Sequence, residues 1–328
     1  MKSFPALCFV LSLLSGSLFP EGTLEKLLAM DAKKKEKYAF NPASTLPSRL
    51  ALAPGFVYDY LTNLDQDPGY RAYLPVGEER QIVERTLARL PPLNQRVLKE
   101  RLLGMYFIEG FQGSGMADFV LDARSNFYFI IVLNRAVLGR NLSEQFTYRE
   151  STCFRQGNDG TTVRVDCGTN ERGLLYILLH ESTHAVDYVR RINPFVEESL
   201  RPYLREIPKS TAFSRGLWEG LETPIAPARY TGRDRVTFYG FNQGPKLAAA
   251  EAPDLYRALT NSGFVSLYAS QNWAEELAEL VTLRAMTERL RLPYRILVER
   301  GGKTVEVFEP AASPKALERF KAVDAFFN

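Results

Sequence analysis

Histidine is nearly missing from this sequence, with only two among 328 residues. Both lie in one stretch, "LLYILLHESTHAVDYV", where His180 and His184 are four positions apart. The lack of a third histidine excludes any metal site built from three imidazoles, so a further protein ligand has to be a carboxylate. The rarity of the residue makes the close spacing of these two informative about function.

Cysteine is also scarce, with three residues. Cys8 lies in the N-terminal apolar run, so removal of that run would leave Cys153 and Cys167. Two cysteines without a nearby histidine do not form a zinc knuckle. The intervening "GNDG" predicts the turn of a β-hairpin, which a Cys153–Cys167 disulfide would close. Two reduced, buried thiols are the alternative.

The sequence also has little excess positive charge. Its net charge is only +3, and the basic residues are scattered along the chain. A nucleic-acid-binding protein needs a basic face, so we expect no nucleic acid partner. The nearest approach to a charge run is "KKKEK", Lys33 to Lys37, which is typical of a solvated linker or helix end, with a membrane surface or an anionic partner as the alternative. A hydrophobic content of 45% is ordinary for a globular protein with one large or two modest domains.

Long apolar runs are absent except at the N-terminus, where one extends from Phe4 to about Leu14. This run is too short for a permanent membrane span. It follows Lys2 and precedes Ser-Gly-Ser, an arrangement typical of a secretory signal over residues 1–17. We therefore expect an exported, periplasmic or extracellular protein, with a buried first helix as the alternative.

The rest of the chain predicts an N-terminal extension over 18–77, a main domain over 78–290 and a C-terminal hairpin and helix over 291–328 that pack on the same domain. Hydrophobic periodicity and turn signals predict the principal elements. These are two helices within 78–104 separated by Pro91-Pro92, a strand over 126–134, a helix over 171–191, a helix over 272–290, a hairpin around Gly301-Gly302 and a closing helix in "SPKALERFKAVDAFF".

The histidine pair has the spacing of a metal site. Residues four apart lie on one face of an α-helix, so His180 and His184 can direct two nitrogens at one ion. Glu181 is rotated away from that face but can reach water on the ion, as the general base does in the H-E-x-x-H motif. Imidazole ligands suit Zn²⁺. Two structural histidines are the alternative, and each would need hydrogen-bond partners.

The third ligand has several carboxylate candidates. Asp187 lies on the helix face of His184, but about 10.5 Å of helix separates it from His180, too far for one ion. It is better placed to hydrogen-bond His184 or an arginine, and a plain solvated or salt-bridged aspartate is the alternative. Downstream, "SLYASQNWAEELAEL" offers three further glutamates.

Together, "HESTH" and the later "YASQNWAEELAE" resemble the gluzincin metallopeptidases. The resemblance covers the two motif helices, and Trp273 stands where proline is common in that pattern. It implies that Glu275 is the third zinc ligand, with Glu276 and Glu279 as alternatives. It also implies that Glu279 can orient a histidine and that Tyr268 can donate a hydrogen bond to the oxyanion, with a core aromatic as the alternative for Tyr268.

This resemblance implies a zincin-like α+β fold, in which a mixed sheet packs on the HExxH helix and a helical lobe carries the glutamate. We expect an exported zinc metallopeptidase that cleaves peptide or protein substrates with zinc-activated water and Glu181 as base. Strand Phe127–Leu133 would then bind an extended peptide, or else be a plain core strand. The alternatives are a catalytically inactive zincin-fold binding protein and a hydrolase of a non-peptide amide such as a cell-wall linkage.

Overall fold

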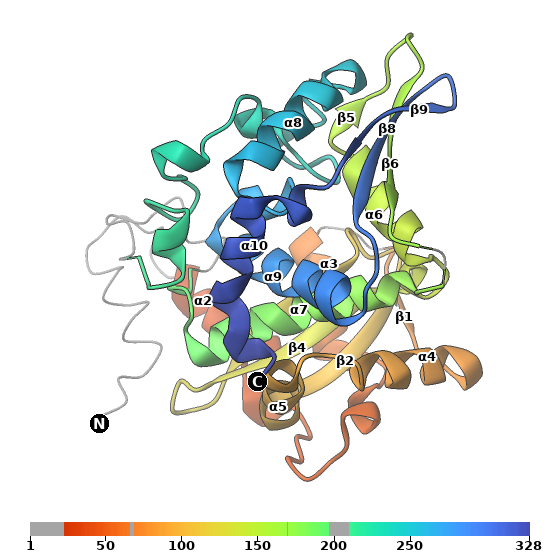
Figure 1. Cartoon of the computed structure of the whole chain (residues 1–328). Coiled ribbons are helices and arrows are strands. Elements are labelled where there is room, and N and C mark those ends of the chain that lie inside the picture. The colour runs from red at the N-terminus through yellow and green to blue at the C-terminus, as the bar shows by residue number, and fades with distance from the viewer. Residues whose placement is uncertain (1–22, 66–68, 169, 197–209) are drawn as a thin grey trace. The chain divides into compact units, whose positions relative to one another are not determined.

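The computed structural model describes residues 23–65, 69–168, 170–196 and 210–328 (Figure 1). The expected signal peptide, 1–17, lies outside these residues. Two compact units are present, one formed by Met1–Ala136 with Glu181–Phe213 and the other by Val137–His180 with Ser214–Asn328. Helix α7, Gly173–Arg190, contributes residues to both units, and the expected domain boundaries at 78 and 290 stay a prediction.

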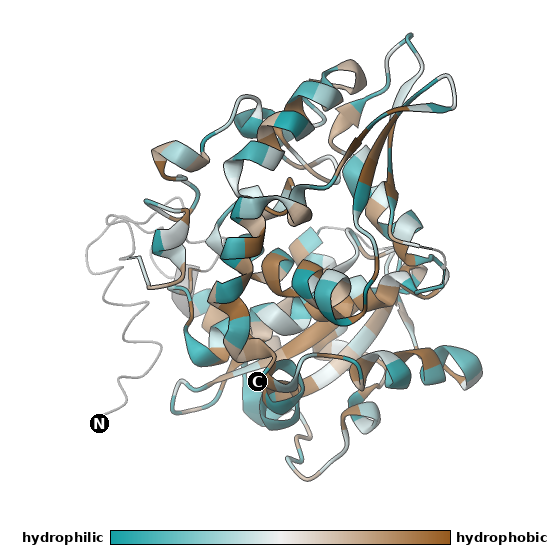
Figure 2. Ribbon diagram, viewed as in Figure 1, coloured by the Kyte–Doolittle hydropathy of each residue, from teal (hydrophilic) through white to brown (hydrophobic). Residues whose placement is uncertain are grey.

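The first unit contains a four-stranded sheet in the order β1-β2-β4-β3. Its strands are β1 (Arg71–Tyr73), β2 (Leu102–Glu109), β3 (Gly115–Leu121) and β4 (Phe127–Asn134). β2 and β4 are parallel and the other pairs are antiparallel, which confirms the expected α+β class with a mixed sheet. In Figure 2 the strands β2 and β4 are mostly brown to white, whereas α4 alternates between teal and brown.

Strand β4 forms where expected, because "FYFIIVLN" is rich in aromatic and β-branched residues and is buried along most of its length. Its neighbours β2 and β3 occupy both of its edges. The expectation that Phe127–Leu133 binds an extended peptide is therefore wrong, since no backbone edge of β4 remains for it. β4 is a core strand, and β3 is the edge strand beside it.

The helices of the first unit are α2 (Thr23–Ala29), α3 (Gly55–Asp65), α4 (Gly77–Leu87) and α5 (Pro92–Arg101). The break between α4 and α5 at Pro91-Pro92 is confirmed. Proline lacks the N–H that would continue α4, and it suits the first turn of α5. Among the described residues, no helix combines the length and the apolar character that crossing a membrane requires.

The second unit contains a three-stranded antiparallel sheet, β6-β8-β9, and a short parallel pair, β5-β7. The hairpin β8–β9 turns at Gly301 and Gly302, both of which have positive φ, as the sequence predicted. The elements of this unit are α6 (Leu142–Ser151), β5 (Phe154–Arg155), β6 (Thr161–Asp166), β7 (Leu247–Ala248), α8 (Ala252–Ser262), α9 (Trp273–Arg284), β8 (Arg295–Arg300), β9 (Lys303–Phe308) and α10 (Pro314–Phe320).

The expected Cys153–Cys167 hairpin and disulfide are wrong. β5 pairs with β7 and β6 pairs with β8, so the strands that follow Cys153 and precede Cys167 belong to different sheets. Both cysteines are buried free thiols. Burial raises the pKa of each thiol, which keeps the reactive thiolate scarce.

A reducing agent should therefore leave the stability of the folded protein unchanged. We expect the same thermal unfolding midpoint with and without reductant, because no cross-link between Cys153 and Cys167 restricts the unfolded chain. Differential scanning calorimetry on the two samples measures this directly. A midpoint that falls by several degrees on reduction would contradict the free-thiol state.

Candidate metal centre

Helix α7 carries both histidines, and its observed span of Gly173–Arg190 confirms the expected helix. His180, Glu181 and His184 are all buried. Asn94 on α5 donates through Nδ2 to Ser182 Oγ at 2.7 Å and Thr183 Oγ1 at 3.1 Å. Nothing in the local sequence around Asn94 indicates this role, although two consecutive hydroxyl residues in an apolar helix indicate that a polar partner exists. These bonds fix the rotation of α7 about its axis.

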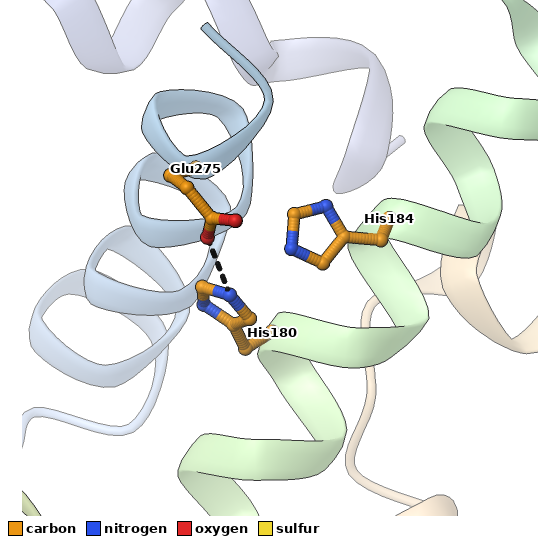
Figure 3. Close-up of side chains that lie close together, drawn as sticks. All are labelled: His180, His184 and Glu275. Carbon is orange, nitrogen blue, oxygen red and sulfur yellow. Dashed lines mark hydrogen bonds and ion pairs between the residues drawn. The ribbon is translucent and has the colours of Figure 1, made fainter. Parts of the chain in front are cut away.

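His180, His184 and Glu275 come together as one group (Figure 3). Each offers a ligand atom, and the three atoms lie within 4.8 Å of one another. His180 Nε2 is 3.0 Å from Glu275 Oε2, and His184 follows one turn later on α7. Two ligands of a tetrahedral zinc ion lie about 3.4 Å apart. His180 Nε2 and Glu275 Oε2 would therefore have to separate by only a few tenths of an ångström to admit the ion.

The three neighbouring glutamates on α9 differ in their surroundings. Glu275 is 21% exposed and faces His180, while Glu276 and Glu279 are completely or almost completely buried. Glu276 accepts hydrogen bonds from Trp218 Nε1 and Arg319 Nε, each at 2.6 Å. Of the three candidates left open by the sequence, the structure brings Glu275 to both histidines and directs Glu276 toward other partners.

The local sequence explains why Glu275 lies at the start of α9. Asn272 caps this helix, and its Oδ1 accepts from the backbone N–H groups of Ala274 and Glu275 at 2.9 and 3.0 Å. Glu275 therefore lies in the first turn, where the helix dipole favours a carboxylate. The cap holds the backbone of the candidate ligand in place.

Glu279 lies one turn further along α9 and orients His180. Its Oε1 is 3.1 Å from His180 Nδ1 and accepts from the Tyr176 hydroxyl at 3.0 Å. Its Oε2 accepts from Ser266 Oγ at 2.6 Å and Arg149 Nη1 at 2.9 Å. Burial raises the pKa of Glu279, but Arg149 and then His180 outweigh it and hold that pKa at about 2.

When the Nδ1–H of His180 donates a hydrogen bond to the ionised Glu279, a neutral His180 ring carries its lone pair on Nε2. That lone pair faces Glu275 Oε2 at 3.0 Å. Two acceptors at this distance repel each other unless a proton or a cation lies between them. The orientation of His180 by Glu279 thus creates a position suited to a cation.

Arg149 on α6 is the centre of a buried ionic network that sequence analysis missed. Its side chain is fully buried and pairs with Glu279 and with Glu150, the latter at 2.8 Å. Glu150 also accepts from the Tyr256 hydroxyl at 2.6 Å. In sequence, "YRES" is typical of an exposed helix, so no local signal indicated this role.

Glu181 is held within the first unit by the edge strand. Its Oε2 accepts the backbone N–H of Ala117 on β3 at 2.7 Å, and the carbonyl of Ala117 accepts from the Tyr188 hydroxyl at 3.1 Å. Ala117 was not singled out from the sequence, because its role depends on its backbone and not on its side chain. The bond fixes the position of the carboxylate on α7.

Asp187 and Tyr268, the two remaining predicted residues, lie near the histidines. Asp187 accepts from Asn193 N at 2.7 Å and Asn193 Nδ2 at 3.0 Å, so it closes the turn after α7. Burial raises the pKa of Asp187 to about 6. The ring of Tyr268 lies edge-on to the His180 imidazole, with 5.5 Å between centroids.

The chain matches no family model, no curated protein and no solved structure. Its function is therefore inferred from the candidate metal ligands and from the elements that hold them.

Proposed function

We propose that this chain is an exported zinc-dependent peptidase of the gluzincin type, with His180, His184 and Glu275 as zinc ligands and Glu181 as general base. The observation that carries the proposal is the grouping of two imidazoles and one carboxylate, with a further carboxylate on the same helix directly after the first histidine. The α+β class with a mixed sheet supports the zincin-like architecture that the two motifs imply.

The donor set favours zinc over other common metals. Two imidazole nitrogens and one carboxylate oxygen are typical zinc ligands, whereas Ca²⁺ and Mg²⁺ prefer oxygen atoms only. Three protein ligands are typical of catalytic zinc, since a structural site uses four. The His180–Glu279 contact is the kind of outer hydrogen bond that fixes the tautomer of a ligating histidine.

Zinc bound by these residues would lower the pKa of water towards 7 and polarise the substrate carbonyl. Glu181 then takes the proton of the attacking water and delivers it to the leaving nitrogen. Its Oε2 is anchored by the N–H of Ala117, so we assign the proton transfer to Oε1. Tyr268, beside His180, donates to the oxyanion that develops during attack.

Metal binding tests the ligand assignment. We expect wild type to retain about one equivalent of zinc after dialysis, and His184→Ala and Glu275→Ala to bind it more than about 100-fold more weakly, beyond the usual effect of an outer partner. Glu276→Gln is the matched control on the same helix turn and should keep near-wild-type affinity. Zinc content by atomic emission and affinity by competition with a chelating dye provide the measurements.

Hydrolysis tests the activity. Cleavage of a quenched fluorescent peptide library should stop on chelation and return when zinc is added back. Full zinc retention by Glu275→Ala would contradict that ligand. A zinc-loaded wild type that turns over no peptide would contradict the peptidase and favour a binding protein or a hydrolase of another amide.

A further inference from the structure

The outer edge of β3, on the side away from β4, lies in the same unit as Glu181. In an antiparallel pair, alternate residues direct their backbone groups toward the partner strand. Asn134 N donates to Ser114 O at 3.0 Å, so in this register the even-numbered residues of β3 face β4. The odd-numbered residues face outward, as the bonds of Ala117 to Glu181 and Tyr188 show. An extended peptide that pairs with β3 near Glu181 would use the outward-facing groups of Gly115 and Phe119, and at Ala117 it would have to share or replace the contacts of Glu181 and Tyr188.

A segment from the N-terminal part of the chain already covers the far half of this edge. We call Asp31–Lys37, which forms the short helical turns η1 and η2, the strap. Lys34 forms a parallel β-bridge with Leu121, the last residue of β3. Glu36 Oε1 accepts from the backbone N–H of Ala123 at 3.2 Å. The strap therefore occupies the outward-facing position at Leu121.

A buried ion pair anchors the strap. Lys33 Nζ is 2.5 Å from Asp118 Oδ1 on β3, and the two side chains are 1% and 11% exposed. The same ammonium lies 4.1 Å from the centroid of the Phe119 ring. The expectation that Lys33 to Lys37 form a solvated linker is thus wrong for Lys33. A buried ammonium needs its partner, so this contact favours one register of the strap on β3.

The strap limits the length of chain that can pair with β3. An extended peptide advances about 3.3 Å per residue, so only about four residues fit between Ala117, beside Glu181, and the bridge at Leu121. Among the described residues, these contacts of the strap are with Asp118, Leu121 and Ala123, and none of them is with Gly115 at the other end of β3. The strap therefore restricts the length of a bound peptide on one side of Glu181.

We propose that the strap restricts this hydrolase to bonds near the N-terminus of its substrates. Antiparallel pairing, which is slightly more stable per residue than parallel pairing, places the N-terminal end of the peptide at Leu121. The substrate class is then unfolded polypeptides or oligopeptides from which short N-terminal fragments of up to about four residues are released. This inference rests on the proposed peptidase function and specifies its substrates.

A ladder of peptides tests this. One cleavable core sequence is extended by zero to about eight residues at its N-terminus, and a second set is extended equally at its C-terminus. Wild type should cleave at least about tenfold more slowly once more than about four residues precede the bond, because the additional residues meet the strap at Leu121 and the peptide gives up backbone hydrogen bonds to β3 to avoid it. Extension at the C-terminus should leave kcat/KM unchanged. Mass spectrometry of the products identifies each cleaved bond.

Release of the strap provides the second measurement. Lys33→Glu places like charges at Lys33 and Asp118, so it should expel the strap and raise cleavage of the long N-terminal extensions towards the rate of the short ones. Lys37→Glu is the matched control, because it makes the same charge change at an exposed strap residue, and it should keep the length limit. The wild-type ladder decides the question if Lys33→Glu does not fold.

The outcomes separate this inference from the proposed function. Cleavage that Glu181→Gln abolishes, but that is equally fast with long N-terminal extensions, overturns the strap inference and leaves the peptidase standing. A limit on C-terminal extension alone overturns the antiparallel direction. Absence of any cleavage that depends on Glu181 overturns the peptidase, and the strap inference with it.

Discussion

Glu181→Gln is expected to lower kcat by about 10²–10⁴-fold, the range for loss of a positioned general base, while zinc content stays at the wild-type level. Glutamine has almost the same shape as glutamate, and its remaining carbonyl oxygen can still accept the N–H of Ala117. It cannot take a proton from water. Because Glu181 is not one of the three grouped ligands, the metal should remain bound.

The measurement is single-turnover and steady-state hydrolysis of one peptide by zinc-loaded protein, with the metal quantified in the same sample. Glu100→Gln is a suitable control, since this exposed carboxylate on α5 forms a long ion pair, at 4.0 Å, with Arg190. Glu181→Gln with undiminished hydrolysis would eliminate Glu181 as the base. Loss of zinc from that variant would indicate that Glu181 also helps to hold the ion.

Arg149→Met is expected to lower the free energy of unfolding by about 3–5 kcal/mol, the cost of removing one partner from a buried ionic network. Methionine fills much of the volume, but it leaves the carboxylates of Glu150 and Glu279 without their counter-charge. A total stability of about 5–15 kcal/mol is usual, so this single change removes a large share of it. Weaker zinc binding should accompany the loss, because Arg149 holds the carboxylate that orients His180.

Urea denaturation of the metal-free proteins measures this effect. Arg295→Met is the control, because Arg295 makes only half-exposed pairs with Asp166 and Glu309 and its loss should cost at most about 1 kcal/mol. If Arg149→Met unfolds at the wild-type urea concentration, the buried network does not stabilise the second unit.

The stability that Glu279 contributes through this network depends on pH. The pKa of Glu279 is lowered from its ordinary 4.5 to about 2, so its ionised form is favoured in the folded state. Its contribution to stability is therefore fully present above pH 4.5 and is lost as the pH falls through about 2. Arg149→Met should weaken this dependence, since the charge that depresses the pKa of Glu279 is gone.

Local patterns predicted several elements correctly, because each depends on neighbours in sequence. The apolar periodicity around His180 indicated α7, and the aromatic and β-branched run over 126–134 indicated β4. Pro91-Pro92 separated two helices through the missing proline N–H. Strand pairing was less predictable: the turn between Cys153 and Cys167 suggested a hairpin, yet β5 and β6 find partners in different sheets. A turn signal does not specify which distant strand supplies the ladder hydrogen bonds.

The sequence by itself determined that His180 and His184 share one face of a helix with Glu181 beside them, because the backbone hydrogen bonds of a helix repeat every few residues and set the relative directions of these side chains. The resemblance pointed to Glu275 but left Glu276 and Glu279 open, and only the tertiary structure brought Glu275 beside both histidines, placed Ala117 against Glu181, and paired Arg149 with Glu279. These partners are 95, 64 and 130 residues apart, respectively. Packing of whole elements decides such contacts, and no periodicity within a single helix or strand encodes them.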